Sequence, residues 1–301
     1  MLFQTKFIIP ETHRGLLFKD EQFVDLLGAG AHTFWDLQKQ YKVQTVTATS
    51  AINNPVSEQM LNLADTYPER FAEQIQRWET GKQEVGLVYQ DKVLKDLKAP
   101  AQRGAYWSGK RRAIEVRKLD IADDIRVPAA LANQLVTTKD TTLRNAALAA
   151  VVMSTVPEGF IGFLEVDGVQ REVLPTGGHV WWQFNHAIKV TQLDTRLQNM
   201  EVNGQEILTK DRVGLRINLS ALWQVKDAQL VKSSLVDHKD YLYRELQLAL
   251  RSVVSTQTLD ELLAEKNLLN QTIQSMVAEK AAAYGLELST VGRVTLFYPV
   301  K

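Results

Sequence analysis

The chain has 301 residues and balances 35 lysines and arginines against 35 aspartates and glutamates, so its formal net charge is zero. That balance excludes a strongly basic protein that binds nucleic acid by bulk electrostatics, and it excludes an acidic, self-repelling disordered chain. The sequence has no cysteine and is 45% hydrophobic, which excludes disulfides and cysteine-ligated metals and is ordinary for a globular protein.

No stretch of the sequence resembles a membrane-spanning helix. The longest uncharged apolar run, at about residues 145–157, is far shorter than the roughly 20 residues that a spanning helix needs. The N-terminal MLFQTKFIIPETHR has no small-residue cleavage site, so we do not interpret it as a signal peptide. We therefore expect a cytoplasmic protein whose contact with a membrane is peripheral at most.

The first element along the chain is a hairpin pattern that recurs twice. Each occurrence has a glycine that opens an apolar segment, an aspartate at a turn and, further on, a tryptophan. The glycines are Gly15, Gly86 and Gly162, the aspartates Asp20, Asp91 and Asp167, and the tryptophans Trp35, Trp107 and Trp182. Three occurrences in the same order predict an internal repeat.

Each copy is predicted to be a β-hairpin followed by a turn and another strand. Asp167-Gly168 has the preferred chemistry of a two-residue hairpin turn, and Gly177 supplies a positive φ before the next strand. His32 and His179 occupy equivalent positions after a glycine, which is more typical of turn residues than of metal ligands.

Residues 47–80 interrupt the hairpin pattern. Apolar residues from Met60 to Ile75 and Trp78 are separated by many charged residues. We expect one or two helices here, broken at Pro68 and packed across the first hairpin.

Residues 213–225 give the clearest strand, because apolar and other residues alternate with period two. Trp223 lies on the apolar face and is expected to be buried. A helix is predicted at 238–254 with Asp237 as its N-cap. Thr258 and Glu261 have the spacing of a capping box.

The capping box opens a long helix to about Tyr284, which Gly285 closes. Its predicted apolar stripe includes Leu263 and Met276, and a last strand follows. The order of strands, two helices and a strand predicts an α+β fold, an antiparallel sheet with helices on one face.

The C-terminal half resembles the SPFH (Band 7) domain of stomatins, prohibitins and flotillins, and it is most similar to stomatin-like slipins. The resemblance covers about residues 154–298 and rests on blocks in the family's order, VPEGFIGFLEVDGVQREVLPTGGHVWW, LDTR, EILTKDRVGLRINLSALWQV, ALRSVVSTQTLDELL and YGLELSTVGRV. Within them, the resemblance implies structural roles for Asp194, Arg196, Lys210 and Asp211. The N-terminal half resembles degenerate copies of the same β-hairpin unit.

These similarities divide the chain into three parts. Residues 1–80 hold the first hairpin copy plus a helical segment, 81–153 a second degenerate SPFH-like copy, and 154–301 the SPFH/Band 7 domain. Family members usually have an N-terminal membrane anchor and a coiled coil after the last strand, and we recognise neither in this sequence.

The resemblance implies a non-enzymatic scaffold that self-associates and organises membrane-associated or protein partners. It implies a homo-oligomer, with a membrane protein or a protease as a partner. The charge balance leads us to expect no nucleic acid as a partner. One alternative is a soluble protein-binding or chaperone-like module that uses the tandem hairpins. Another is an enzyme with an unrecognised site, although the sequence shows no spacing typical of catalytic, cofactor-binding or metal sites.

Two groups of charged residues are the candidate interaction sites. The outer face of the helix at 259–284 is suited to a neighbouring subunit and includes Glu261, Glu265, Lys266 and Glu279; alternatively, the helix only covers its sheet. The basic cluster beside Trp107 is suited to an anionic surface such as lipid head groups; alternatively, it is a solvated loop. That cluster consists of Arg103, Lys110, Arg111 and Arg112.

Overall fold

The computed structural model describes residues 4–109, 113–264 and 266–297, apart from the side chains of 266, 267 and 293–297. The chain forms two compact units. The first consists of Met1–Met153 and Val180–Ile188, and the second of Ser154–His179 and Lys189–Lys301. The first unit therefore includes residues 180–188, which in the sequence follow the first segment of the second unit.

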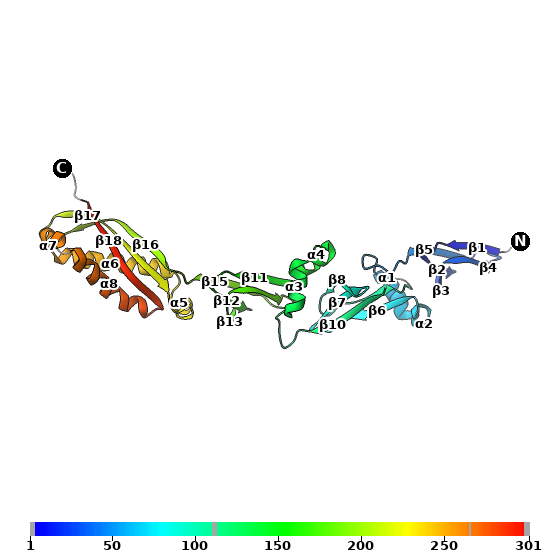
Figure 1. Cartoon of the computed structure of the whole chain (residues 1–301). Coiled ribbons are helices and arrows are strands. Elements are labelled where there is room, and N and C mark those ends of the chain that lie inside the picture. The colour runs from blue at the N-terminus through cyan, green and yellow to red at the C-terminus, as the bar shows by residue number, and fades with distance from the viewer. Residues whose placement is uncertain (1–3, 110–112, 265, 298–301) are drawn as a thin grey trace. The chain divides into compact units, whose positions relative to one another are not determined.

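The elements are numbered in chain order, and Figure 1 labels most of them. Up to residue 150 they are β1 (Gln4–Ile9), β2 (His13–Lys19), β3 (Gln22–Leu27), β4 (Gly30–Trp35), β5 (Tyr41–Thr47), α1 (Glu58–Thr66), α2 (Pro68–Phe71), β6 (Ile75–Glu79), β7 (Glu84–Gln90), β8 (Val93–Lys98), β9 (Arg103–Trp107), β10 (Ile114–Asp120), α3 (Ala129–Thr137) and α4 (Thr141–Ala150).

The remaining elements are β11 (Val151–Val156), β12 (Phe160–Val166), β13 (Val169–Leu174), β14 (Gly177–Trp182), β15 (Ile188–Asp194), β16 (Gln198–Leu208), β17 (Gly214–Val225), α5 (Ala228–Ser234), α6 (His238–Thr256), α7 (Leu259–Ala264), α8 (Lys266–Ala282) and β18 (Leu286–Phe297). The structure confirms the predicted α+β class, with antiparallel sheets and several helices.

The strands up to β15 form three groups of five that we call modules: β1–β5, β6–β10 and β11–β15. In each module the second strand lies between the third and the fifth, and the first pairs with the fourth. The hairpin register breaks at one place in each module. The breaks fall between Leu17 and Phe18, between Val88 and Tyr89, and between Leu164 and Glu165.

The three glycines of the repeat pattern lie where their strands pack closely against neighbouring side chains. A Cβ on Gly15 would come within 2.4 Å of the Ile9 side chain, and one on Gly162 within 2.8 Å of Val156. A Cβ on Gly86 would lie 3.1 to 3.2 Å from Lys98, Thr80 and Val116. Close packing therefore accounts for glycine at the start of these hairpins.

The hairpin turns share a left-handed backbone. The two central residues of the third turn, Asp167 and Gly168, have φ of 53° and 79°. The corresponding pairs Asp20-Glu21 and Asp91-Lys92 also have positive φ. These angles confirm the turn predicted at Asp167-Gly168.

The helical interruption after the first module is shorter than the sequence predicts. α1 and α2 meet at Pro68 as expected, and Phe71 stacks on Phe23 of the first hairpin with ring centroids 5.8 Å apart. Ile75 and Trp78, predicted to continue the helix, instead lie on strand β6. The apolar spacing was misleading because the three-residue step from Ile75 to Trp78 matches a helical stripe, whereas in the strand it places the two side chains on opposite faces.

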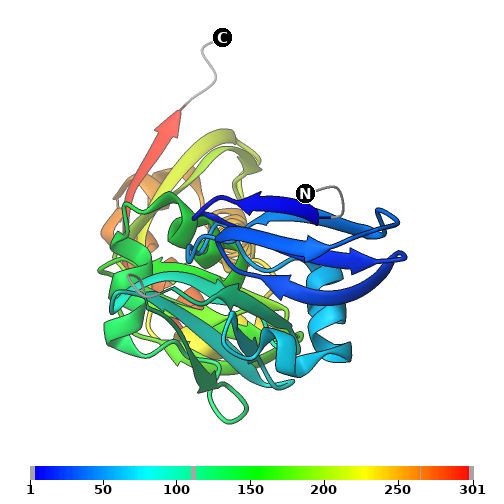
Figure 2. The same cartoon turned by 90° about the vertical axis from the view of Figure 1, so that its right-hand side faces the viewer.

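Helical segments follow the first and the second module. In Figure 2 the blue strands of residues 4–47 lie beside the cyan helical segment that follows them. Helices α3 and α4 follow the second module, and α4 packs against β8. These two helices were not predicted from the sequence, although Asp140 is an N-cap whose carboxylate accepts from the amides of Thr142 and Leu143.

The C-terminal sheet holds the largest core. β17 lies between β16 and β18, and α6 and α8 pack on this sheet (Figure 1). The predicted alternation on β17 is confirmed, because every second side chain from Leu215 to Val225 is buried, including Trp223 at 1% exposure. The predicted apolar face of α6 is also buried, from Leu242 to Val253.

The helix ends match the predicted caps. The Asp237 carboxylate accepts from two amides of α6, and Thr258 and Glu261 form a reciprocal capping box. The last helix ends at Ala282, and Gly285 has a φ of 81°. Leu263 and Met276 were wrongly assigned to its buried stripe, since they are 40% and 39% exposed.

Candidate interaction site

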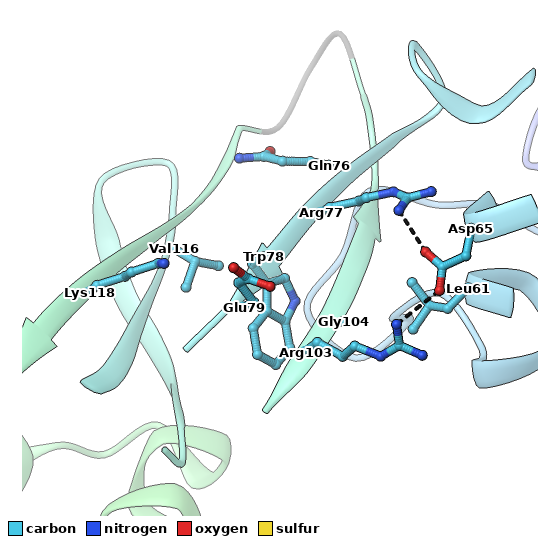
Figure 3. A pocket seen from close by; sticks show the side chains of 10 residues that line it. All are labelled: Leu61, Asp65, Gln76, Arg77, Trp78, Glu79, Arg103, Gly104, Val116 and Lys118. Atoms are coloured by element: carbon cyan, nitrogen blue, oxygen red, sulfur yellow. Dashed lines mark hydrogen bonds and ion pairs between the residues drawn. The ribbon is translucent and has the colours of Figure 1, made fainter. Parts of the chain in front are cut away.

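A cavity of about 440 Å³ lies between α1 and the strands of the second module. Figure 3 shows its lining side chains: Trp78 forms one wall, and Arg77 and Arg103 point toward Asp65 of α1. A Cβ on Gly104 would come within 2.6 Å of the Trp78 ring. Glycine therefore allows the indole to lie flat on β9.

Asp65 joins the helix to two strands. Its carboxylate accepts from Arg77 of β6 at 2.7 Å and from Arg103 of β9 at 2.9 Å. Arg77 also donates to the carbonyl of Ala64, and Arg103 lies 3.6 Å from Glu58. The pairs are about half exposed, so each contributes only about 0–1 kcal/mol to stability. The arrangement holds α1 on the second module rather than presenting free charge.

A half-buried cation, Lys98, also lies beside the Trp78 ring. Lys98 Nζ is 5.6 Å from the Trp78 ring centre and 5.9 Å from that of Tyr106, and it pairs with Asp96 at 2.8 Å. Burial is the largest single influence and opposes the charge of Lys98, but the hydrogen bonds and charge interactions with Asp96 and Tyr106 together outweigh it, so the pKa of the amine is raised. Burial raises the pKa of the Tyr106 hydroxyl. The cluster is a structural cation–π contact.

The basic cluster predicted to touch an anionic surface is divided by the structure. Arg103 is paired with Asp65 and Glu58. Lys110, Arg111 and Arg112 lie outside the described residues. Arg103 is therefore committed to α1, and its contact with an anionic surface remains a prediction.

The candidate assembly face is only partly described. Glu261 accepts from the Thr258 amide at 2.8 Å in the capping box, and this bond lowers the pKa of its carboxyl. Glu279 is exposed on α8. Glu265 lies outside the described residues, and the side chain of Lys266 is not among those described. Glu279 is thus the described member of this group that is exposed and not used in a cap.

The polar positions singled out by the family resemblance lie in turns or, for Asp194, at the end of strand β15. Arg196 forms a double ion pair with Asp194 at 2.6 and 2.9 Å, and its guanidinium lies 4.9 Å from the Phe160 ring centre. Asp211 accepts from the hydroxyl of Thr209 and from the amide of Leu259 at 3.3 Å. It therefore ties the turn after β16 to the first residue of α7.

The junctions between modules in the first unit were not predicted from the sequence. Tyr106-Trp107 ends β9 and Trp181-Trp182 ends β14, and each strand is joined at its edge by an extended segment that leads into helices. Pro55 bridges to Tyr106, and Arg126 bridges to Trp181. The recurring aromatic–tryptophan pair was the available signal, but a sequence pattern does not reveal which strand edges are covered.

Within the described residues, no group of three or more His, Asp or Glu side chains is placed to hold a metal ion. No helix among them is long and apolar enough to cross a membrane.

Comparison with known proteins adds a family match. Residues 154–297, slightly less than half of the chain, match the family model described as SPFH domain / Band 7 family. The chain is 34% identical over 106 residues to a stomatin homologue of Pyrococcus horikoshii, and the match covers 34% of this chain and 39% of that protein.

Two further relatives also match over only part of this chain and part of their own length. A stomatin homologue of Pyrococcus abyssi is 34% identical, with 34% of this chain and 38% of that protein covered. Mechanosensory protein 2 of Caenorhabditis elegans is 24% identical, with 36% of this chain and 23% of that protein covered. The chain therefore spans about two fifths or less of the length of these relatives.

Proposed function

Because residues 154–297 form an SPFH/Band 7 domain, we propose that the chain is a slipin-like, non-enzymatic scaffold that self-associates and organises protein partners. The domain match is the observation that carries this proposal. The family resemblance further suggests a membrane protein or a protease as partner, and a cytoplasmic location with peripheral membrane contact.

We also propose that the three modules are copies of one unit. The division into residues 1–80, 81–153 and 154–301 separates them except at two places, because β6 of the second module and the start of β11 of the third lie before its boundaries. The same strand pairings, the same hairpin break and the same positive-φ turn in each module support this proposal. Tandem modules lengthen the chain on the N-terminal side of the domain and offer several surfaces to partners.

Self-association is proposed to use the outer face of α8. Its inner face packs on the sheet, and its outer face exposes Glu279 together with Leu268 and Met276, which are 47% and 39% exposed. An exposed face of mixed apolar and charged side chains is suited to modest, salt-sensitive contacts between subunits.

Sedimentation velocity over a range of protein and salt concentrations tests this proposal. We expect concentration-dependent association that weakens at high salt and in the double reversal Glu265→Lys and Glu279→Lys. A matched control, Glu11→Lys with Glu73→Lys, changes the net charge equally at exposed positions of the first unit and should associate like the wild type. A monomer under all conditions contradicts the scaffold.

A soluble binding module is the second candidate, and one observation favours it. Trp35 of the first module is 75% exposed. Tryptophan is enriched among the residues that anchor protein interfaces, so an exposed tryptophan is suited to contact with a partner. A strict monomer that still binds a polypeptide would support this candidate over the scaffold.

A further inference from the structure

Each module contains a strand that ends in an aromatic residue followed by tryptophan: Phe34-Trp35 on β4, Tyr106-Trp107 on β9 and Trp181-Trp182 on β14. The exposure of the tryptophan differs sharply among them. Trp107 is 3% exposed and Trp182 is 1% exposed, whereas Trp35 is 75% exposed. The same position is therefore covered twice and open once.

The cover over Trp107 comes from the segment that follows the first module. Val56 donates its amide to the carbonyl of Ala105 at 2.9 Å, so residues 54–56 lie along the edge of β9. The chain then enters α1, which packs on β9. Trp107 shares a buried cluster with Met60 and Leu61 of that helix.

The cover over Trp182 has the same construction. Val127 donates to the carbonyl of Val180 at 3.0 Å, and the amide of Trp182 donates to the carbonyl of Ile125 at 2.8 Å. Helices α3 and α4 follow this extended segment. Trp182 lies in a buried cluster with Leu131 and Leu143 of these helices.

Strand β4 has no such cover among the described residues. It pairs with β1 alone, so its other edge offers unpaired backbone groups. Ile8 and Leu37 near this strand are 72% and 69% exposed. The strand edge and the apolar side chains together form what we call the Trp35 edge, defined by β4, Ile8 and Leu37.

The charge of Lys6 at the Trp35 edge matches that of Arg77 at the covered junction of Trp107. Thr33 and Ala105 each lie two residues before the tryptophan, and their cross-strand partners are Lys6 and Arg77. Arg77 pairs with Asp65 of the covering helix at 2.7 Å. Lys6 is exposed and forms no ion pair with the residues that the structure describes. A carboxylate on a covering helix would complete the same pair.

We propose that the Trp35 edge binds a partner polypeptide in which an extended segment leads into an acidic amphipathic helix. The extended segment adds a strand to the edge of β4, the apolar helix face covers Trp35, and a helix carboxylate meets Lys6. Main-chain pairing at a sheet edge supplies affinity, and the side chains supply selectivity. The inference deepens the proposed partner-binding role and rests on the proposed equivalence of the modules, but it does not require self-association.

A labelled peptide with the sequence of residues 50–72 is a suitable probe, because it contains the extended segment, α1 and α2. Fluorescence anisotropy with the full chain should show saturable binding. Trp35→Ser should weaken binding at least tenfold. Because the Trp35 side chain is exposed, the thermal unfolding midpoint of this variant should match that of the wild type. Val136→Ser, at another exposed apolar residue of the first unit with 55% exposure, should bind normally.

A charge swap tests the orientation of the helix. Lys6→Glu should weaken binding of the wild-type peptide severalfold, and a peptide with Asp65→Lys should restore it. Restoration distinguishes a direct pair from a general loss of positive charge.

Three results would overturn the inference. The first is no binding of the peptide, and the second is binding that Trp35→Ser leaves unchanged, which would place the peptide elsewhere, for example at β9. The third is Trp35-dependent binding to phosphatidylcholine–phosphatidylserine vesicles without peptide binding, which would assign the edge to a membrane. A monomeric wild type that binds the peptide would reject only the self-association proposed above.

Discussion

Single residues decide how closely the strands of each module approach. Gly162 opens the third hairpin because a side chain there would enter space held by Val156 and Leu174. Gly178, on β14, has no atom within 4 Å of its ideal Cβ position and no positive φ. The two glycines therefore serve different needs, although both lie on strands of the same module.

The first prediction contrasts these two glycines. Gly162→Ala should lower the free energy of unfolding by about 1–3 kcal/mol, because an added methyl group forces well-packed neighbours to move. Gly178→Ala should stay within about 0.5 kcal/mol of the wild type, as expected for an open surface position. Urea denaturation of both variants checks the contrast, and equal effects would contradict the packing argument.

The second prediction concerns acid stability at Asp194. The hydrogen bond from Arg196 lowers the pKa of this carboxyl. A folded-state pKa below the unfolded value of about 3.9 means that the group stabilises the fold above that pH. The contribution is lost as the pH falls from about 4 through the lower folded-state pKa, where the carboxylate becomes protonated in both states.

Asp194→Asn removes this contribution. Its denaturation midpoint should lie below the wild type at pH 7 and converge with it as the pH falls below 4. Asp123→Asn is the matched control, because Asp123 is exposed and forms no ion pair with described residues. A constant difference between Asp194→Asn and the wild type at every pH would indicate that the pKa shift does not contribute.

At the scale of elements, strand β17 organises the C-terminal sheet because it pairs on both edges. Its alternate side chains supply six members of the core beneath α6 and α8. Helices on one face explain why its other face can carry polar residues such as Asn218 and Ser220.

The third prediction tests the two faces of β17. Trp223→Ala should cost about 3–5 kcal/mol, as for other large side chains removed from a core. Leu222→Ala should cost much less, since Leu222 is 38% exposed on the opposite face. Thermal and chemical denaturation should agree on this order. A loss below about 1 kcal/mol for Trp223→Ala would show that its neighbours do not depend on it.

The same elements show what local sequence determines. The alternation of β17, the N-cap Asp237 and the capping box at Thr258 were predictable because each depends on residues a few positions apart. Helix α3 was missed because it begins after Pro128 without a side-chain cap. Strand β6 was mistaken for helix because the three-residue step from Ile75 to Trp78 fits a helical period, and only its pairing with β9 reveals the strand.

The candidate site was less accessible to prediction. Arg103 was identified as a cation, but its acidic partners Asp65 and Glu58 lie about forty residues away in sequence. The open edge at Trp35 was also hidden, because its sequence pattern is the same as at the covered tryptophans. Only the pairing of distant strands distinguishes an exposed tryptophan from a buried one.

At the scale of the whole molecule, sequence segments and compact units do not coincide. Val180 and Trp182 belong to the first unit although residues 154–179 belong to the second. Trp182 contributes to the buried cluster of α3 and α4. A boundary placed after residue 153 therefore removes part of a core that precedes it.

The fourth prediction compares fragments 1–153 and 1–190. Hydrogen exchange of the α3 amides should be fast in the shorter fragment, because Leu131 and Leu135 lose the cover of Trp182. Protection should increase in the longer fragment, which retains that residue. The full chain with Trp182→Ala is the matched control and should resemble the shorter fragment. Equal protection of α3 in all three proteins would mean that the helices fold independently of β14.

The covered junctions also bear on synthesis at the ribosome. Each helical segment leaves the exit tunnel before the aromatic strand that will cover it, since α1 precedes β9 and α3 precedes β14. The nascent chain therefore exposes one apolar helix face after another, and every new module closes the face of the one before. At these junctions the chain order therefore limits the exposed apolar helix surface to one helical segment at a time during translation.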